Sequence, residues 1–348
     1  MKEKIKMKKI NLYIKEWIKK YPIEGFFLLA IAICFGTLFP AIYIVPHDTT
    51  LGQILAFYLG RIGAYSPVLS GILITQIIQY ERHQVSFNHR IKVLLPAWFI
   101  AIFIQAAELN LTARHEIPMI GLIILALPVS LLPAWVISSA FSWTGGVRSW
   151  LETLVKPKGN IVYYLIALLT FPFIHVFGNV ITNFINSRTL FPDISQVISL
   201  VYTIFITFLS VLFFSGGINE EAGWRGFAQK RLQAKYSPII SIFILWFLMV
   251  IWHIPNDLLQ YQNGGYLMVR IAIYPVITIL FSWIYNRTNG SILPVAIFHA
   301  SMNSMNPLME IFPITTAGNI MLIGLAIIVF VSDRMWQKLP KNHPAVYH

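Results

Sequence analysis

Long uncharged apolar segments recur along this chain, and they restrict the folds it can adopt. Gly25 to Val45 and Ile117 to Phe141 each exceed the roughly 20 helical residues that cross a bilayer. We count ten such segments, centred near residues 35, 68, 101, 129, 173, 206, 247, 276, 299 and 322. Only 11% of the 348 residues are charged, against roughly 25% in soluble domains. The sequence predicts an all-α, polytopic transmembrane helical bundle of about 8–10 spans.

The basic residues predict how these spans are oriented. The net charge of +12 would suit a nucleic-acid partner, but 22 of the 26 Lys and Arg fall in loops on one side of the predicted bundle. The other side carries Arg114 and Arg188, while Arg61 and Arg270 lie inside spans. By the positive-inside rule we expect a multi-pass protein of the cell membrane with both termini in the cytoplasm. Its partner is then the lipid bilayer, and we expect no nucleic-acid partner.

The chain shows no short repeat and no Gly/Ser linker, so we expect one bundle with four segments. Residues 1–22 form a basic interfacial N-terminal segment, which eight lysines hold to the anionic leaflet. Residues 23–190 form N-terminal transmembrane helices, 195–308 a helical core, and 309–348 the last span and a cytoplasmic tail. The lone Cys34 excludes intramolecular disulfides and cysteine-ligated metals.

Ionisable groups at membrane depth are candidates for function because their burial is costly. Residues 1 to about 190 hold almost none, so any chemistry is expected in the second half. The first candidate is Asn219, Glu220, Glu221 and Arg225, directly after the uncharged span Ile194 to Ser215. A purely structural interpretation also fits: Asn219 caps a helix, the carboxylates favour its N-terminal dipole, and Glu221 pairs with Arg225 at i, i+4.

Two histidines add to this candidate site. His253 is the ionisable residue of an otherwise apolar segment, and His299 lies four residues before Asn303, on one helical face. A lone histidine in a span is more often a packed core residue than a catalyst. Together, however, a carboxylate and a histidine can take a proton from water, and a second histidine with an amide can stabilise an oxyanion. This set suffices for peptide hydrolysis without a serine or cysteine nucleophile.

These residues carry a family resemblance. Glu-Glu-x-x-x-Arg at 220 to 225, a histidine at the end of the next span, and His-x-x-x-Asn at 299 to 303 resemble the three motifs of the CPBP family. That family includes CAAX prenyl endopeptidases and bacterial bacteriocin-processing or self-immunity proteins. The resemblance covers roughly residues 195 to 308. One departure is Met249, where the second motif often has Phe four residues before its histidine.

The resemblance implies a role for each residue. Glu220 is expected to be the general base, His253 to help activate the water, and His299 with Asn303 to form the oxyanion site. Glu221 and Arg225 are expected to support the site or orient the substrate. The family is named for metalloproteases, and Glu220, His253 and His299 could bind a divalent metal such as zinc. A metal-free glutamate mechanism needs the same residues, so the cofactor stays open.

The sequence leaves several functions and substrates open. We expect an endopeptidase that acts on a peptide or membrane-anchored protein. Two alternatives are a non-catalytic self-immunity or scaffold protein of the same fold, and a transporter. Serine and aspartyl intramembrane motifs are missing. Prenylated CAAX tails, bacteriocin leaders and other anchored peptides are candidate substrates. The richness in Lys, Ile and Asn suggests a bacterial source, which favours peptide processing over CAAX cleavage.

The predicted topology contains one conflict. Glu220 falls at the cytoplasmic end of its span, whereas His253 lies well inside the next span, about 15 residues or 22 Å deeper. The two residues can meet only if the Glu220 segment dips into the membrane or the span of His253 begins outside it. Pro255 and Asn256 are also expected to break the helix that carries His253.

Overall fold

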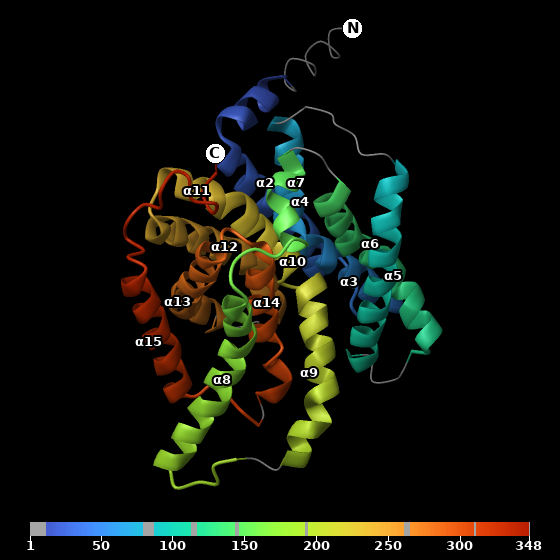
Figure 1. Ribbon diagram of the computed structural model, residues 1–348. Coiled ribbons are helices and arrows are strands. Elements are labelled where there is room, and N and C mark those ends of the chain that lie inside the picture. The colour runs from blue at the N-terminus through green and yellow to red at the C-terminus, as the bar shows by residue number, and fades with distance from the viewer. Residues whose placement is uncertain are drawn as a thin grey trace.

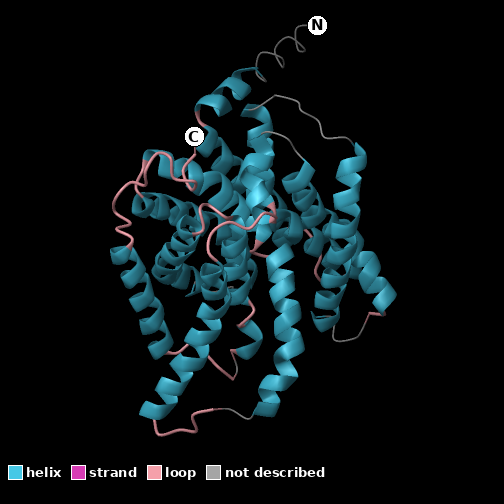
Figure 2. Cartoon of the chain, in the orientation of Figure 1, coloured by secondary structure: helices cyan, strands magenta, loops and turns pink. Residues whose placement is uncertain are grey.

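All regular structure in the described part of the chain is helical (Figure 2). The computed structural model describes residues 12–78, 87–112, 117–142, 146–191, 194–260, 265–309 and 311–347. After a helix at 12–20, the long helices are α2 (Pro22–Tyr43), α3 (Thr50–Ala64), α4 (Ser66–Ile78), α5 (Phe87–Thr112), α6 (Met119–Ser142), α8 (Ile161–Ile185), α9 (Ile194–Phe214), α12 (Pro238–Gln260), α13 (Gly265–Arg287), α14 (Ile292–Asn303) and α15 (Thr316–Ser332). Short helices are α7 (Gly146–Leu151), η1 (Glu152–Leu154), α10 (Ile218–Glu221), η2 (Ala222–Gln229), α11 (Lys230–Lys235) and η3 (Asn306–Leu308). The predicted all-α bundle is confirmed.

The bundle is that of a multi-pass membrane protein. Seven helical segments of the described chain are long and apolar enough to cross a membrane, and the bent pair α3 and α4, which meet at 53°, could form an eighth span. The helices at the last two predicted centres are shorter, because α14 has 12 residues and α15 has 17. Large apolar side chains such as Leu28, Phe173 and Phe247 are exposed on the outer faces, as lipid contact requires.

Both ends of the described chain lie at the same end of the bundle. Figure 1 shows them there with α7 and α11, while the connection after α8 lies at the opposite end. Helix α11 contains three basic residues, and the connection after α8 contains Arg188. The predicted clustering of basic residues is therefore visible in these segments, and their cytoplasmic orientation stays a prediction. The first eleven residues, Arg82 and Arg114 lie outside the described residues.

Two glycines break the helix that leads to the carboxylates. Helix α9 ends at Phe214, Gly216 adopts φ +148°, and α10 begins at Ile218. The π-helix η2 and then α11 continue the path, so that one helical segment runs from Leu200 to Lys235 and contains an apolar stretch long enough to cross a membrane. Figure 1 shows α10 between α9 and α11, in the middle of the molecule.

This path corrects the predicted depth of Glu220. The helical path does not end before Glu220 but continues through it to Lys235, and Glu220 and Glu221 are both buried. The backbone bends at Gly216 and goes on helically, so the carboxylates lie inside the bundle and no conflict with His253 remains. The expected helix break at Pro255 is also absent, since α12 continues to Gln260.

Aromatic packing joins the N-terminal helices to this broken helix. Phe26 of α2 stacks on Phe227 with ring centroids 4.9 Å apart, and it meets Trp224 edge-on at 5.6 Å. Phe27 stacks on Trp224 at 5.8 Å. Buried aromatic pairs of this kind add to the free energy gained by burying their surface. The N-terminal helices therefore hold η2 in place and belong to the same core.

Candidate active site

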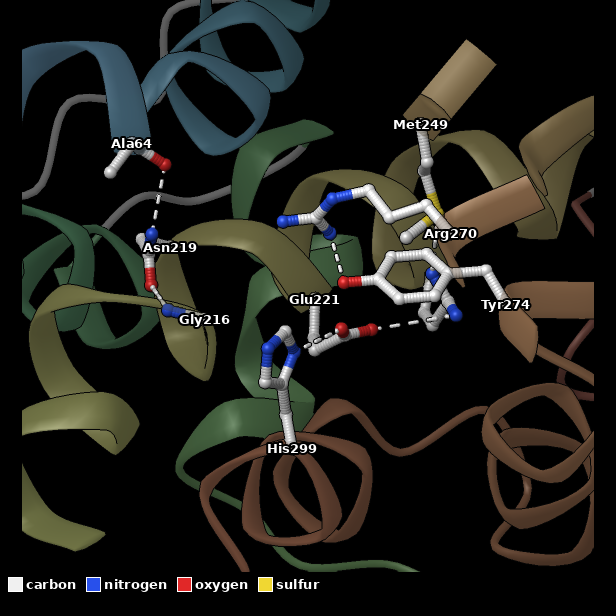
Figure 3. Close-up of polar contacts among 9 residues, drawn as sticks. Ala64, Gly216, Asn219, Glu221, Met249, Arg270, Tyr274 and His299 are labelled. Carbon is white, nitrogen blue, oxygen red and sulfur yellow. Dashed lines mark hydrogen bonds and ion pairs between the residues drawn. The ribbon is translucent and has the colours of Figure 1, made fainter. Parts of the chain in front are cut away.

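Asn219 fixes the start of the broken helix. Its Oδ1 accepts a hydrogen bond from the Gly216 backbone N–H at 2.8 Å, and its Nδ2 donates to the Ala64 carbonyl at 2.8 Å (Figure 3). The predicted N-cap role is wrong, because Gly217 precedes α10 and no side chain caps it. Asn219 instead ties the glycine turn to the end of α3.

Glu221 is the centre of a buried polar cluster. Its Oε1 accepts a hydrogen bond from His299 Nδ1 at 2.8 Å, as Figure 3 shows. Its Oε2 lies 3.4 Å from Arg225 Nε, so the predicted i, i+4 pair is confirmed. Both partners of that pair are at most 1% exposed, and Arg225 is therefore not the loop residue that the predicted topology made it. One carboxylate thus holds both a histidine and an arginine inside the bundle.

Met249 completes this cluster. Arg225 Nη1 donates to Met249 Sδ at 3.4 Å, and the guanidinium lies 4.9 Å from the centre of the Phe281 ring. A thioether sulfur is a weak hydrogen-bond acceptor, whereas a phenyl ring would meet the guanidinium with its π face. The departure from the family pattern at position 249 therefore places a weak acceptor against the arginine of the first motif.

Glu220 is buried but its carboxylate is not engaged in the same cluster. Its Oε2 has no hydrogen-bond partner in the described part of the chain, although the residue is only 6% exposed. A buried polar atom without a partner carries a free-energy cost that calls for an explanation such as catalysis. Oε2 of Glu221 also lacks a hydrogen bond but lies in the ion pair with Arg225, whereas Oε2 of Glu220 has neither kind of partner within the described residues.

His253 is oriented by its own helix. Its Nδ1 donates to the Met249 carbonyl at 2.7 Å, since a carbonyl can only accept. In the neutral ring the proton then sits on Nδ1, and Nε2 is left with a lone pair. Trp252 and Tyr274 pack edge-on against the ring, at 4.6 and 5.8 Å between centroids. The imidazole is therefore held with one basic nitrogen available.

One cavity of about 550 Å³ joins the predicted residues. Glu220 from α10, His253 from α12, and His299 and Asn303 from α14 all line it, together with Glu221 and Arg225. These helices come from distant parts of the sequence, and the fold brings them to one site. The catalytic roles that the resemblance implies for them stay predictions.

Arg270 and its partners were not predicted at this site. On α13, Arg270 is 4% exposed, and its Nε donates to Asp257 Oδ2 at 2.6 Å. It also donates to the Tyr274 hydroxyl (Figure 3). Arg270 and Tyr274 line the cavity. The signal was present in the sequence, because Arg270 is an arginine inside a predicted span.

The N-terminal helices also contribute charges, which corrects a second prediction. Arg61 of α3 and Glu108 of α5 pair at 2.6 Å between Nη2 and Oε2, and both line the cavity. Glu108 lies in a span that was expected to hold almost no ionisable group at membrane depth. Glu108 stands four residues before the end of α5, close to the end of that span.

The geometry does not form a metal site among the described residues. No three His, Cys, Asp or Glu side chains are grouped there so that they could hold a metal ion. Glu220, His253 and His299 are therefore not grouped as the carboxylate-and-two-imidazole cluster of a catalytic zinc. Both histidines donate through Nδ1, His253 to a carbonyl and His299 to Glu221, and such bonds also orient histidines that bind a metal through Nε2.

The fold and the cavity define a class: a multi-pass membrane protein with buried Glu and His side chains around an internal cavity. Residues 202–305 match the family model described as type II CAAX prenyl endopeptidase Rce1-like. The chain is also similar to CAAX prenyl protease 2 of Methanococcus maripaludis, with 30% identity over 132 residues, 34% of this chain and 48% of that protein. The match thus spans about half the length of this relative. The resemblance to the CPBP proteases is confirmed for this segment.

Proposed function

We propose that this protein is an intramembrane endopeptidase that hydrolyses a peptide bond of a membrane-associated substrate. One observation carries the proposal: Glu220, His253, His299 and Asn303 line a single cavity, in a segment that matches a CAAX endopeptidase family. The multi-pass bundle makes a membrane-anchored peptide or protein the natural substrate. Because the basic residues are predicted to cluster on one side of the bundle, we place both termini in the cytoplasm and the protein in the cell membrane.

The first step of the proposed reaction is attack by water. Glu220 takes a proton from a water molecule while Nε2 of His253 accepts a hydrogen bond from it. The water oxygen forms a bond to the carbonyl carbon of the substrate, and the carbonyl π electrons move to the oxygen. The unpaired Oε2 of Glu220 is the observed atom that suits this proton transfer.

The second step is collapse of the tetrahedral intermediate. His299 and Asn303 donate hydrogen bonds to the oxyanion, which lowers the barrier because the charge develops in a water-poor site. Since Nδ1 of His299 donates to Glu221, the ring must carry a proton on both nitrogens to donate from Nε2. Glu220 then returns its proton to the leaving nitrogen as the oxyanion re-forms the C=O bond and the C–N bond breaks. A carboxylic acid and an amine are released, and the acid gives its remaining proton to the amine or to water.

The test is cleavage of a panel of fluorogenic membrane-anchored peptides by the detergent-purified protein. We expect wild type to cleave at least one peptide, and Glu220→Ala and His253→Ala to abolish cleavage with the fold intact. Glu152→Ala, a carboxylate outside the cavity, is the matched control and keeps activity. A parallel series with a chelator decides whether a metal takes part. A well-folded wild type that cleaves none of the peptides would favour the self-immunity or scaffold alternative.

A further inference from the structure

Arg61 and Glu108 form a second charged group on the wall of the candidate active-site cavity. They come from α3 and α5, outside residues 202–305, and their side chains are 14% and 23% exposed. The guanidinium lies 5.4 Å from the ring centre of Phe57 and 5.6 Å from that of Phe214. Two charges placed among aromatic rings inside a bundle are costly and point to function.

The fold places this pair close to the candidate catalytic carboxylate. Ala64, one turn after Arg61 on α3, accepts the hydrogen bond of Asn219, which immediately precedes Glu220. Three residues of helix separate Arg61 from Ala64 by about 4.5 Å along the axis. A peptide whose scissile bond lies at Glu220 can therefore reach Arg61 within the same cavity.

Among the three arginines that line the cavity, Arg61 has the fewest polar partners within the described residues. Arg225 forms an ion pair with Glu221 and a hydrogen bond to Met249, and Arg270 bonds to Asp257 and Tyr274. Arg61 donates through Nη2 to Glu108, and no other hydrogen bond of its guanidinium is made within the described residues. A guanidinium has five N–H donors in a plane that matches a carboxylate. Arg61 thus retains donors toward the cavity.

Glu108 is better suited to fix Arg61 than to bind a ligand. Its Oε2 accepts hydrogen bonds from both Arg61 and Gln105. A basic ligand would compete with two donors already in place, whereas an anionic ligand meets the open edge of the guanidinium. The pair therefore favours a negatively charged group in this part of the cavity.

We propose that Arg61, positioned by Glu108, binds a carboxylate of the peptide substrate and so determines specificity. This inference rests on the proposed endopeptidase function, because it needs a peptide in the cavity. The carboxylate is either the C-terminal one or that of an acidic side chain. In both cases the salt bridge anchors the substrate while Glu220 acts on a peptide bond.

Peptide binding tests the proposal independently of cleavage. Three N-palmitoylated fluorescent peptides share one apolar sequence: the first ends in a free carboxylate, the second in an amide, and the third in an amide preceded by Glu. Their Kd values are measured in the Glu220→Gln background and with Arg61→Gln added. We expect Arg61→Gln to weaken binding of a carboxylate-bearing peptide by about tenfold to a hundredfold and to leave the neutral peptide unchanged. Whether the first or the third peptide responds identifies the source of the carboxylate.

Further variants keep the proposal falsifiable if Arg61→Gln folds poorly. Arg61→Gln/Glu108→Gln leaves no unpaired charge and should show the same selective loss, whereas Glu108→Gln retains carboxylate-dependent binding. Arg287→Gln is the matched control, because Arg287 pairs with Asp333 outside the cavity. Equal Kd values for charged and neutral peptides in the presence of Arg61 would overturn the proposal even if wild type cleaves peptides. Selective binding without any cleavage would instead contradict the protease function alone.

Discussion

Nδ1 of His299 donates a hydrogen bond to Oε1 of Glu221 at 2.8 Å, in the interior of the bundle. The partners are 78 residues apart in sequence, so this bond joins the first motif to the third. It fixes the imidazole ring and, with it, the direction of Nε2. Because Glu221 also holds Arg225, one carboxylate orients two side chains that line the cavity.

Glu221→Gln should lower the free energy of unfolding, and the kcat of the molecules that remain folded should change less. The substitution keeps the shape but removes the negative charge that compensates buried Arg225. Loss of one partner of a buried ion pair costs about 3–5 kcal/mol. Thermal unfolding in detergent, with kcat measured on the folded fraction, checks this. A variant with wild-type Tm would contradict the supporting role of Glu221, and Glu221→Gln/Arg225→Met should recover part of the stability.

His299→Ala and Asn303→Ala should each lower kcat by about a hundredfold to a thousandfold. The KM should change little, because an oxyanion forms only after the substrate has bound. Steady-state kinetics on the best peptide measures both constants. A large rise in KM with kcat preserved would show that these side chains bind the ground state instead. Ser301→Ala, on the same helix but with its hydroxyl bonded to the Leu168 carbonyl, controls for damage to the helix.

Gly216→Ala should abolish cleavage because the added methyl group would displace the ring of His299. A Cβ at this position would overlap Nε2 of His299, the atom expected to face the oxyanion, and φ +148° disfavours any side chain there. The space beside Nε2 exists because residue 216 is glycine. Gly36→Ala and Gly324→Ala are matched controls, because nothing lies within 4 Å of a Cβ at either position. Full activity in Gly216→Ala would show that the ring need not occupy its observed place.

The C-terminal tail should contribute to stability. Gln233 of α11 donates to the Ala345 carbonyl at 3.0 Å, and Val346 is 4% exposed. The guanidinium of Arg231 lies 4.1 Å from the ring centre of Tyr347. Val346→Asp places a charge in this contact and should cost more than about 2 kcal/mol. Thermal unfolding against Asn342→Asp, an exposed position, measures the difference, and equal Tm values would show that the tail is not docked in solution.

The sequence was sufficient to predict the helical bundle and six of the residues that line its cavity, namely Glu220, Glu221, Arg225, His253, His299 and Asn303. Apolar length alone predicts the spans, and Glu220, His253 and His299 stand out because charge and imidazole are rare at membrane depth. The predicted family resemblance depended on the order of these motifs, and the match over 202–305 confirms it.

Other features depend on tertiary contacts that no local pattern encodes. After the bend at Gly216, the π-helix that follows Glu221 carries the helical path on to Lys235, whereas hydropathy suggested an end at Ser215. The ion pair joins two residues, Arg61 and Glu108, that are 47 positions apart in the sequence and lie on different helices. The hydrogen bond from Asn219 to the Ala64 carbonyl likewise could not be predicted, because an asparagine before a helix is equally suited to cap that helix with its side-chain amide.

The most direct test of the account compares single-turnover cleavage of the best membrane-anchored peptide by wild type and by Glu220→Gln. Both proteins are purified in the same detergent, and their Tm values are compared first. We predict that wild type converts the peptide into two products, one with a new carboxylate and one with a new amine, and that Glu220→Gln forms neither. Cleavage by a folded Glu220→Gln at the wild-type rate would contradict the assignment of Glu220 as the base.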